Sequence, residues 1–147
     1  MNTKYEVVRP SEVGKELEEF LSRELPKLNY KFGNKYDINN ALIYTMMMKG
    51  IFLVGKRNGE IRGIHISWLN VHPFDCEQHI LMQQLFYVMP DSGRMAFHLF
   101  NKFIDIGKES ANHIITMTNE YTNIKSETLE KYGFKEIEKM FRMEIEK

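Results

Sequence analysis

The chain has 147 residues, a length that suits one domain with one sizeable core. Lys and Arg together number 20, as do Asp and Glu, so the formal net charge is zero and the isoelectric point is about 7.0. This balance argues against nucleic-acid binding and against attachment to a membrane surface, because both normally need a basic excess.

Cysteine and histidine usage gives no support for a metal site. The single cysteine, Cys76, cannot form an internal disulfide, and no two of the five histidines have the spacing of a helical metal pair. The N-terminus lacks the basic-then-apolar pattern of a signal peptide, and no apolar run approaches the roughly 18 residues of a membrane span. We therefore expect a cytoplasmic protein in a reducing compartment, with no membrane partner.

The N-terminal third predicts one strand and two helices. Residues 4–9 are typical of a short strand, and residues 11–25 carry apolar side chains at helical spacing. An irregular polar segment follows. A second helix is then predicted over residues 37–50, with Asp37 as its cap and Gly50 at its end.

The remainder predicts a hairpin followed by alternating strands and helices. Strands over 51–56 and 61–69 flank Asn58-Gly59, a pair that adopts positive φ angles easily and is typical of a tight hairpin turn. Residues 70–78 are expected to form a loop. The remaining predicted elements are a strand over 79–88, a helix over 93–111, a strand over 112–118, a helix over 124–132 and a last strand over 134–145.

The predicted order is β-α-α-β-β-β-α-β-α-β. It indicates a single α/β domain over residues 1–147, in which about four helices pack on a mixed, mostly antiparallel sheet of about six strands.

The stretch YVMPDSGRMAFHLF, residues 87–100, joins a strand to a helix through a short loop that contains one glycine. The N-terminus of a helix presents unpaired N–H groups, and it binds anions such as phosphate. An ordinary strand-to-helix turn has the same appearance, so this stretch alone leaves both interpretations open.

Three motifs in this order resemble those of the GCN5-related N-acetyltransferase (GNAT) superfamily. They are the hairpin FLVGKRNGEIRGI, the strand-loop-helix LFYVMPDSGRMAFHLF, and TLEKYGFKEI near the end. The resemblance covers most of the chain and is best from Ile51 to Ile145. It implies acetyl-CoA as co-substrate and an amine as acceptor. Dimers are frequent in the family, so a homodimer is one expected arrangement.

The resemblance also implies where the coenzyme binds. Its pantetheine arm would pair with the main chain near Phe86, Tyr87 and Val88, and Asn123 is similar to an asparagine that often precedes the next helix. The diphosphate would lie on the loop and on the first turn of the following helix, at Ser92, Gly93, Arg94, Met95 and Ala96. Arg94 could add a charged contact.

Two features depart from the family pattern. The loop after Pro90 is about two residues shorter than usual and has a single glycine, and Leu129 stands where a tyrosine normally serves as the proton donor. The position of the usual base falls on Gln84 or Met82, neither of which can take a proton.

The candidate bases that act through a water molecule are therefore His79, Glu77 and His65. A buried histidine with a structural role is the alternative for His65. Aromatic and methionine residues of the second helix region are expected to line an acceptor pocket, or else simply to pack; they are Tyr30, Phe32, Tyr36, Tyr44 and Met48.

The leading hypothesis is an enzyme that moves an acetyl group from acetyl-CoA to an amine. The alternative is a catalytically inactive GNAT-like module with a binding, inhibitory or structural role, similar to some GNAT-like proteins of phages.

Overall fold

The computed structural model describes residues 2–9, 12, 14–28, 50–139, 141, 143 and 145. In chain order its elements are β1 (Thr3–Val8), α1 (Lys15–Glu24), η2 (Leu25–Lys27), β2 (Gly50–Arg57), β3 (Glu60–His72), β4 (Asp75–Val88), α3 (Met95–Ser110), β5 (His113–Ile115) and α4 (Ser126–Tyr132). No helix among these residues is long and apolar enough to cross a membrane.

The described strands form one sheet in the order β1-β2-β3-β4-β5. The first four strands pair antiparallel with their neighbours in sequence, whereas β5 pairs parallel with β4. The crossover from β4 to β5 runs through α3, as a parallel connection requires. The mixed, mostly antiparallel sheet predicted from the sequence is confirmed, with five described strands instead of about six.

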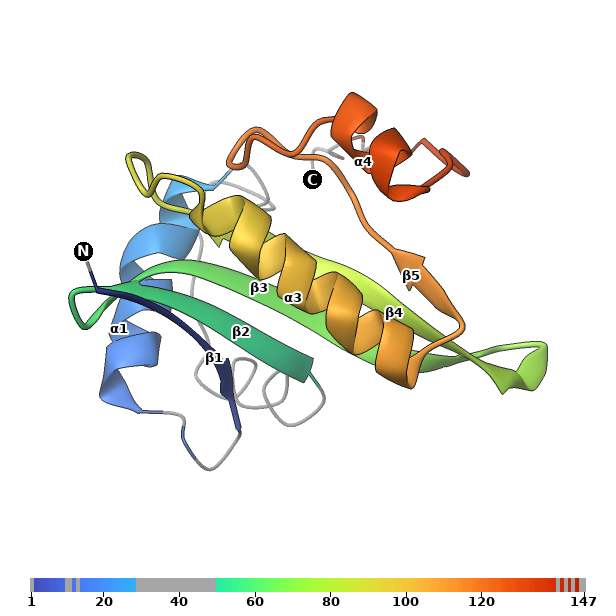
Figure 1. The fold of residues 1–147 in the computed structure, drawn as a ribbon, viewed down its shortest axis with the longest axis horizontal. Helices are drawn as coiled ribbons and strands as arrows, with labels where there is room; N and C mark the ends of the chain where they lie inside the picture. Colours follow the sequence, from blue (N-terminus) through green and yellow to red (C-terminus); the bar gives the residue numbers. More distant parts are fainter. Residues whose placement is uncertain are drawn as a thin grey trace.

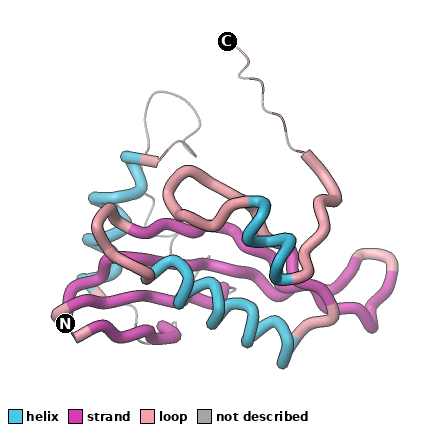
Figure 2. The backbone as a smooth tube through the Cα atoms, turned by 45° about the horizontal axis from the view of Figure 1, so that its top comes forward, coloured by secondary structure: helices cyan, strands magenta, loops and turns pink. Residues whose placement is uncertain are grey.

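Helices cover the sheet on opposite faces (Figure 1). Apolar residues recur along α1 every three or four positions, so Leu17, Phe20 and Leu21 face the core. They pack with side chains that alternate along the strands, and α3 does the same on the other face through Leu99 and Phe103, among others. Figure 2 shows α3 lying along one face of the sheet.

The N-terminus of α3 rests directly on the sheet because two strand residues lack side chains. A Cβ atom at Gly55 would lie 2.6 Å from the sulfur of Met95, and one at Gly63 would lie 2.9 Å from it. Met95 is 1% exposed and fills the space that these glycines leave. This contact fixes the height at which α3 begins, and therefore the position of the loop that precedes it.

The predicted Asn58-Gly59 turn is confirmed: both residues have positive φ, at 53° and 82°. The loop predicted over 70–78 is wrong, because β3 and β4 continue as a paired arm to His72 and Asp75. The polar residues and Pro73 suggested a loop. Main-chain hydrogen bonds between β3 and β4 hold this arm together, however, so its side chains can be polar and exposed. The exposed side chain of Phe74 lies at the tip of this arm.

The strand predicted over 134–145 is also wrong for the described residues. Residues 135–139 have no strand partner in the structure, and the side chains of Ile137, Phe141, Met143 and Ile145 are exposed. Figure 2 shows the chain after α4 running away from the sheet. Alternating apolar residues indicate strand character but do not provide the neighbouring strand. The helix predicted over 37–50 lies outside the described residues except for Gly50, which is the first residue of β2. The predicted pocket residues also lie outside them: Tyr30, Phe32, Tyr36, Tyr44 and Met48.

Candidate functional site

The edge of β4 becomes accessible where β5 ends. The two strands pair only between Ile80–Met82 and His113–Ile115, although β4 continues to Val88. Beyond this pairing the chain after β5 diverges from β4 and passes toward the loop that precedes α3 (Figure 1). A strand edge without a main-chain partner can pair with an extended ligand.

The register shows which main-chain groups of β4 face this gap. Met89 donates its N–H to the carbonyl of Arg62 on β3, and residues that exchange such bonds alternate along an antiparallel pair. The main-chain groups of Tyr87 therefore point toward β3, whereas those of Phe86 and Val88 point into the gap. Further along β4, Gln84 is an extra residue between the pairs Leu85–Ile66 and Gln83–Ser67, a β-bulge that frees its main chain from the ladder.

Two arginines on β2 and β3 hold the loop between β4 and α3. Arg57 donates to the carbonyl of Asp91 at 3.0 Å, and Arg62 donates to the carbonyl of Pro90 at 2.7 Å and to the hydroxyl of Ser92 at 2.9 Å. The Ser92 hydroxyl in turn donates to the Met89 carbonyl at 2.7 Å. The loop is thus fixed by the sheet beneath it rather than by its own few residues.

The same loop turns sharply into α3. Asp91 and Gly93 both have a φ of 61°, a conformation that glycine adopts freely and that aspartate tolerates better than most residues. Met95 N–H is bonded to the Ser92 carbonyl and His98 N–H to the Arg94 carbonyl, whereas the N–H groups of Ala96 and Phe97 lie before the first carbonyl that the helix can offer them. These groups carry the positive end of the helix dipole, which attracts anions.

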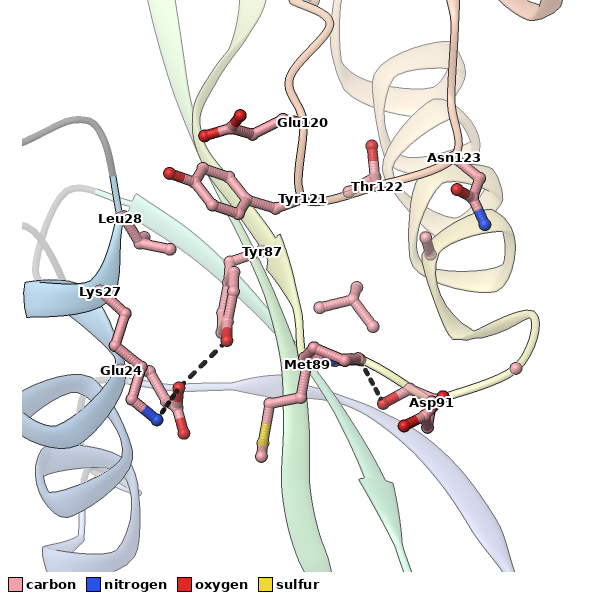
Figure 3. A pocket seen from close by; sticks show the side chains of 15 residues that line it. Glu24, Lys27, Leu28, Tyr87, Met89, Asp91, Glu120, Tyr121, Thr122 and Asn123 are labelled. Carbon is pink, nitrogen blue, oxygen red and sulfur yellow. Dashed lines mark hydrogen bonds and ion pairs between the residues drawn. The ribbon is translucent and has the colours of Figure 1, made fainter.

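A cavity of about 700 Å³ opens beside this helix N-terminus. Its lining comes from the end of α1, the end of β4, the loop before α3 and residues 120–123, as Figure 3 shows. Asp91 and Asn123 lie at the end near α3, and Glu24 and Lys27 lie at the other end. A volume of this order fits a small-molecule ligand.

A buried carboxylate defines the α1 end of the cavity. Glu24 is 1% exposed and receives hydrogen bonds from the Tyr87 hydroxyl at 3.0 Å and from Arg23 Nε at 3.0 Å, with Lys27 Nζ at 3.1 Å. Burial alone would raise the pKa of Glu24, but these three donors lower it below its ordinary value, so the side chain is a carboxylate at neutral pH. Burial and the neighbouring Glu24 raise the pKa of Tyr87 to about 12. The ring of Tyr121 packs edge-on against Tyr87, with ring centroids 5.7 Å apart.

The structure brings many of the predicted coenzyme residues to this cavity. Its lining includes Tyr87, Val88, Ser92, Gly93, Ala96 and Asn123. The remaining three differ in placement. The side chain of Phe86 is buried under α3, so that only its main chain faces the gap; Met95 is buried in the core; and the Arg94 guanidinium lies over the Phe97 ring at 5.6 Å. For all nine residues, contact with the coenzyme remains a prediction.

The three candidate bases, and Gln84 at the usual position of the base, lie elsewhere, and none of them lines the cavity. His79 and Glu77 are on the β3–β4 arm, and Gln84 is the bulged residue of β4. His65 is 0% exposed and lies between the rings of Phe86 and Phe103, with centroids 4.7 and 4.2 Å from its own. Burial lowers the pKa of His65 to about 3, although the nearby Gln83 side chain opposes this slightly. Neither ring nitrogen has a hydrogen-bond partner, so this ring is neutral at pH 7 and has no open route to a substrate proton.

Sequence reasoning did not find the Glu24–Tyr87 pair. The signal was present, because Glu24 continues the apolar spacing of Leu17, Phe20 and Leu21, and a charged residue on the buried face of a helix needs a partner. At the predicted acid position, Leu129 of α4 is partly buried against the core cluster that α3 forms with the sheet, and the nearby Tyr132 donates its hydroxyl to Asn101 at 2.6 Å. No group of three potential metal ligands occurs among the described residues.

Comparison with solved structures places this fold. Ribosomal-protein-alanine N-acetyltransferase from Brucella melitensis matches all of both chains with a TM-score of 0.73 at 12% identity. A predicted acetyltransferase with acetyl-CoA from Clostridium acetobutylicum matches 97% of this chain and 96% of its own, with a TM-score of 0.68 at 12% identity. This chain has the fold of the GNAT superfamily.

The GNAT fold does not by itself fix an activity. A transcriptional regulator from Bacillus halodurans C-125 matches 98% of this chain and all of its own, with a TM-score of 0.70 at 12% identity. No protein-family model and no curated protein matches the sequence, so the likeness is one of structure. The expected GNAT-type sheet is thus confirmed, and the activity has to be argued from the site.

Proposed function

We propose that this protein is an acyl-CoA-dependent N-acyltransferase that moves an acetyl group from acetyl-CoA to an amine. The observation that carries the proposal is the juxtaposition of an unpaired β4 edge with the N-terminus of α3 beside one cavity. An acyl-CoA is an extended amide-containing arm attached to a diphosphate. The strand edge suits the arm, and the helix N-terminus suits the diphosphate. The acetyltransferases of the same fold, one of them with acetyl-CoA, support this assignment.

The residues of this chain would divide the work of binding. Unpaired N–H groups at the start of α3, with those of Gly93 and Arg94, would hold the diphosphate. The gap-facing main-chain groups of Phe86 and Val88 would pair with the arm, and the freed main chain at the Gln84 bulge would lie further along toward the thioester. The fixed loop would bind with little loss of conformational freedom, because Arg57 and Arg62 already hold its carbonyl groups.

The reaction itself is a direct attack. The amine nitrogen forms a bond to the thioester carbonyl carbon, the carbon–sulfur bond breaks, the thiolate leaves with the bonding electrons, and the nitrogen loses its proton to a water molecule. Positioning and carbonyl polarisation contribute most of such a rate enhancement. A thiolate is a stable leaving group, so Leu129 in place of a proton donor is compatible with turnover.

The experiment is a calorimetric titration of the protein with acetyl-CoA, with desulfo-CoA as a comparison, followed by a thiol-release assay against a panel of amines. Gly93→Asp is the informative variant, and Gly93→Asn is its matched control. Both residues tolerate the φ of 61°, and in both the new Cβ would lie 3.3 Å from the Arg57 guanidinium, so they differ by one negative charge beside the cavity. We expect the aspartate to weaken acetyl-CoA binding by at least about tenfold relative to the asparagine. Equal affinities for the two variants, or no binding by the parent protein up to millimolar coenzyme, would contradict the proposal.

A second candidate is a GNAT-like module without catalysis, in a binding, inhibitory or structural role. The observation in its favour is the absence of an acid or base at the expected places. Leu129 is partly buried against the core, and His65 is buried and neutral. Micromolar acetyl-CoA binding without thiol release across the amine panel would favour this candidate, and turnover of any amine would exclude it.

A further inference from the structure

A short row of side-chain hydrogen bonds spans the gap between β4 and the chain that follows β5. Nearest to the paired end, Thr116 Oγ donates to Gln83 Oε1 at 2.7 Å, and Gln83 Nε2 donates to the Met117 carbonyl at 3.2 Å. Further along, Asn119 Nδ2 donates to the carbonyl of Phe86 at 2.9 Å. Side chains therefore continue the connection after the main-chain ladder has stopped.

The last of these bonds falls on a group that the coenzyme arm would use. The Phe86 carbonyl faces the gap, as the register of β4 with β3 requires. An added strand donates an N–H to such a carbonyl, and a pantetheine arm carries two amide N–H groups. The carboxamide of Asn119 offers the same donor to the same acceptor.

Asn119 is held ready for this role by its own backbone. Its Oδ1 atom accepts the N–H of Tyr121 at 2.9 Å, a local turn that fixes the carboxamide and leaves Nδ2 directed at β4. The ring of Tyr121 also packs on Tyr87. The bond to Phe86 thus ties Asn119, which directly precedes the cavity wall of residues 120–123, to the strand that forms another wall.

We propose that Asn119 is a latch that closes the coenzyme gap in the empty protein and has to leave the Phe86 carbonyl before the arm can pair with β4. This inference rests on the proposed function, since it concerns access to the same site. The latch opposes the arm and leaves the diphosphate contacts at α3 unchanged. Its removal should therefore strengthen the binding of ligands that contain the arm, and of those alone.

Two variants separate the latch from its supporting turn. Asn119→Asp retains the oxygen that accepts the Tyr121 N–H but loses the donor to Phe86, and Asn119→Ala loses both. Thr116→Val is the control, because it removes a neighbouring bond across the gap and leaves the Phe86 carbonyl latched. Thermal unfolding of each variant checks that the fold is retained.

The assay is calorimetric titration with three probes: coenzyme A, pantetheine (the arm alone) and 3′-phosphoadenosine 5′-diphosphate (the nucleotide alone). We expect both Asn119 variants to bind pantetheine about two- to tenfold more tightly than the parent, the equivalent of one ordinary hydrogen bond. For Asn119→Asp, the affinity for coenzyme A is divided by the affinity for the nucleotide. Both ligands carry the phosphate groups, so the effect of the added negative charge cancels in this ratio. The Thr116→Val variant should match the parent on all three probes.

Unchanged or weaker pantetheine binding by both Asn119 variants, with nucleotide binding intact, would overturn the latch and leave the coenzyme site standing. Absence of binding for every probe in the parent and in all variants would overturn both the latch and the proposed function. If the Asn119 variants bind pantetheine and the parent and Thr116→Val do not, the latch is supported most strongly.

Discussion

His65 makes the stability of this protein depend on pH above the range in which carboxyl groups ordinarily titrate. The ring is fully buried between two phenylalanine rings, and burial lowers its pKa to about 3. In the unfolded chain a histidine has a pKa near 6.5, so between pH 6.5 and pH 3 the unfolded state binds a proton that the folded state does not bind. Because the folded pKa is the lower of the two, the stabilisation is present above pH 6.5 and is lost as the pH falls toward 3.

The size of the effect follows from the two pKa values. Between pH 7 and pH 5 the free energy of unfolding should fall by about 2 kcal/mol through this one group, with an upper limit of about 5 kcal/mol well below pH 3. Measurement is best confined to pH 5–7, because Glu24 and the other carboxylates titrate below that range. A loss of 2 kcal/mol is a large part of the stability of an ordinary domain.

The assay is urea unfolding at pH 7, 6 and 5, followed through the fluorescence of Trp68, the one tryptophan of the chain. His65→Phe keeps a flat ring between Phe86 and Phe103 but cannot titrate, so its stability should vary with pH by about 2 kcal/mol less than that of the parent. His98→Gln, which removes an exposed histidine from α3, should retain the dependence of the parent. A parent protein whose stability changes by less than about 0.5 kcal/mol over this range, or a His65→Phe variant with the same pH dependence, would refute the reasoning.

Three further substitutions test the architecture of the site. Gly63→Ala should cost about 1–3 kcal/mol in urea unfolding, because the new Cβ would lie 2.9 Å from the Met95 sulfur. Tyr87→Phe should cost about 1.5–3 kcal/mol by the same assay, because it removes one donor from the buried carboxylate of Glu24. Arg62→Ala should weaken binding of 3′-phosphoadenosine 5′-diphosphate by roughly tenfold in calorimetry, because the two bonds that hold the loop before α3 are lost.

Each of these changes has a control elsewhere in the chain. Gly14→Ala should cost clearly less than Gly63→Ala, because the nearest atom to its Cβ would be 3.9 Å away and only the preference for glycine at the N-cap of α1 is lost. Tyr132→Phe removes a hydroxyl that is exposed, and Arg9→Ala removes an arginine far from the loop whose side chain is 79% exposed. Losses as large in these controls as in the test variants would contradict the roles assigned to Gly63, Tyr87 and Arg62.

Local sequence patterns predicted the parts of this fold that local physics determines. The Asn58-Gly59 turn was predictable because few residue pairs adopt two successive positive φ angles. The start of α3 was predictable from a loop with one glycine followed by helical apolar spacing. The last strand predicted over 134–145 was wrong for the described residues, because a strand needs a neighbour as well as an alternating pattern.

The candidate site divides in the same way. The sequence predicted the loop before α3, whose proposed function depends on main-chain N–H groups in one short segment. It did not predict that Arg57 and Arg62 hold this loop, or that Glu24 meets Tyr87, a residue 63 positions away in the chain. Those contacts depend on which strands and helices become neighbours, which no local pattern states. His65 was proposed as a base because of its residue type, whereas its burial, a tertiary property, decides its chemistry.

The two ends of the proposed coenzyme site differ in how they are prepared. Guanidinium groups from Arg57 and Arg62 hold the loop carbonyls, so the diphosphate end is formed before any ligand arrives. At the arm end, the Asn119 carboxamide donates to the Phe86 carbonyl, and this hydrogen bond has to break before the arm can bind there. We therefore expect the nucleotide half of the coenzyme to bind first and to supply most of the affinity, with the arm following once the carboxamide has moved aside. On this view a nucleotide fragment binds the parent protein more tightly than pantetheine does, and the reverse order would show that the strand edge is open and that Asn119 does not guard it.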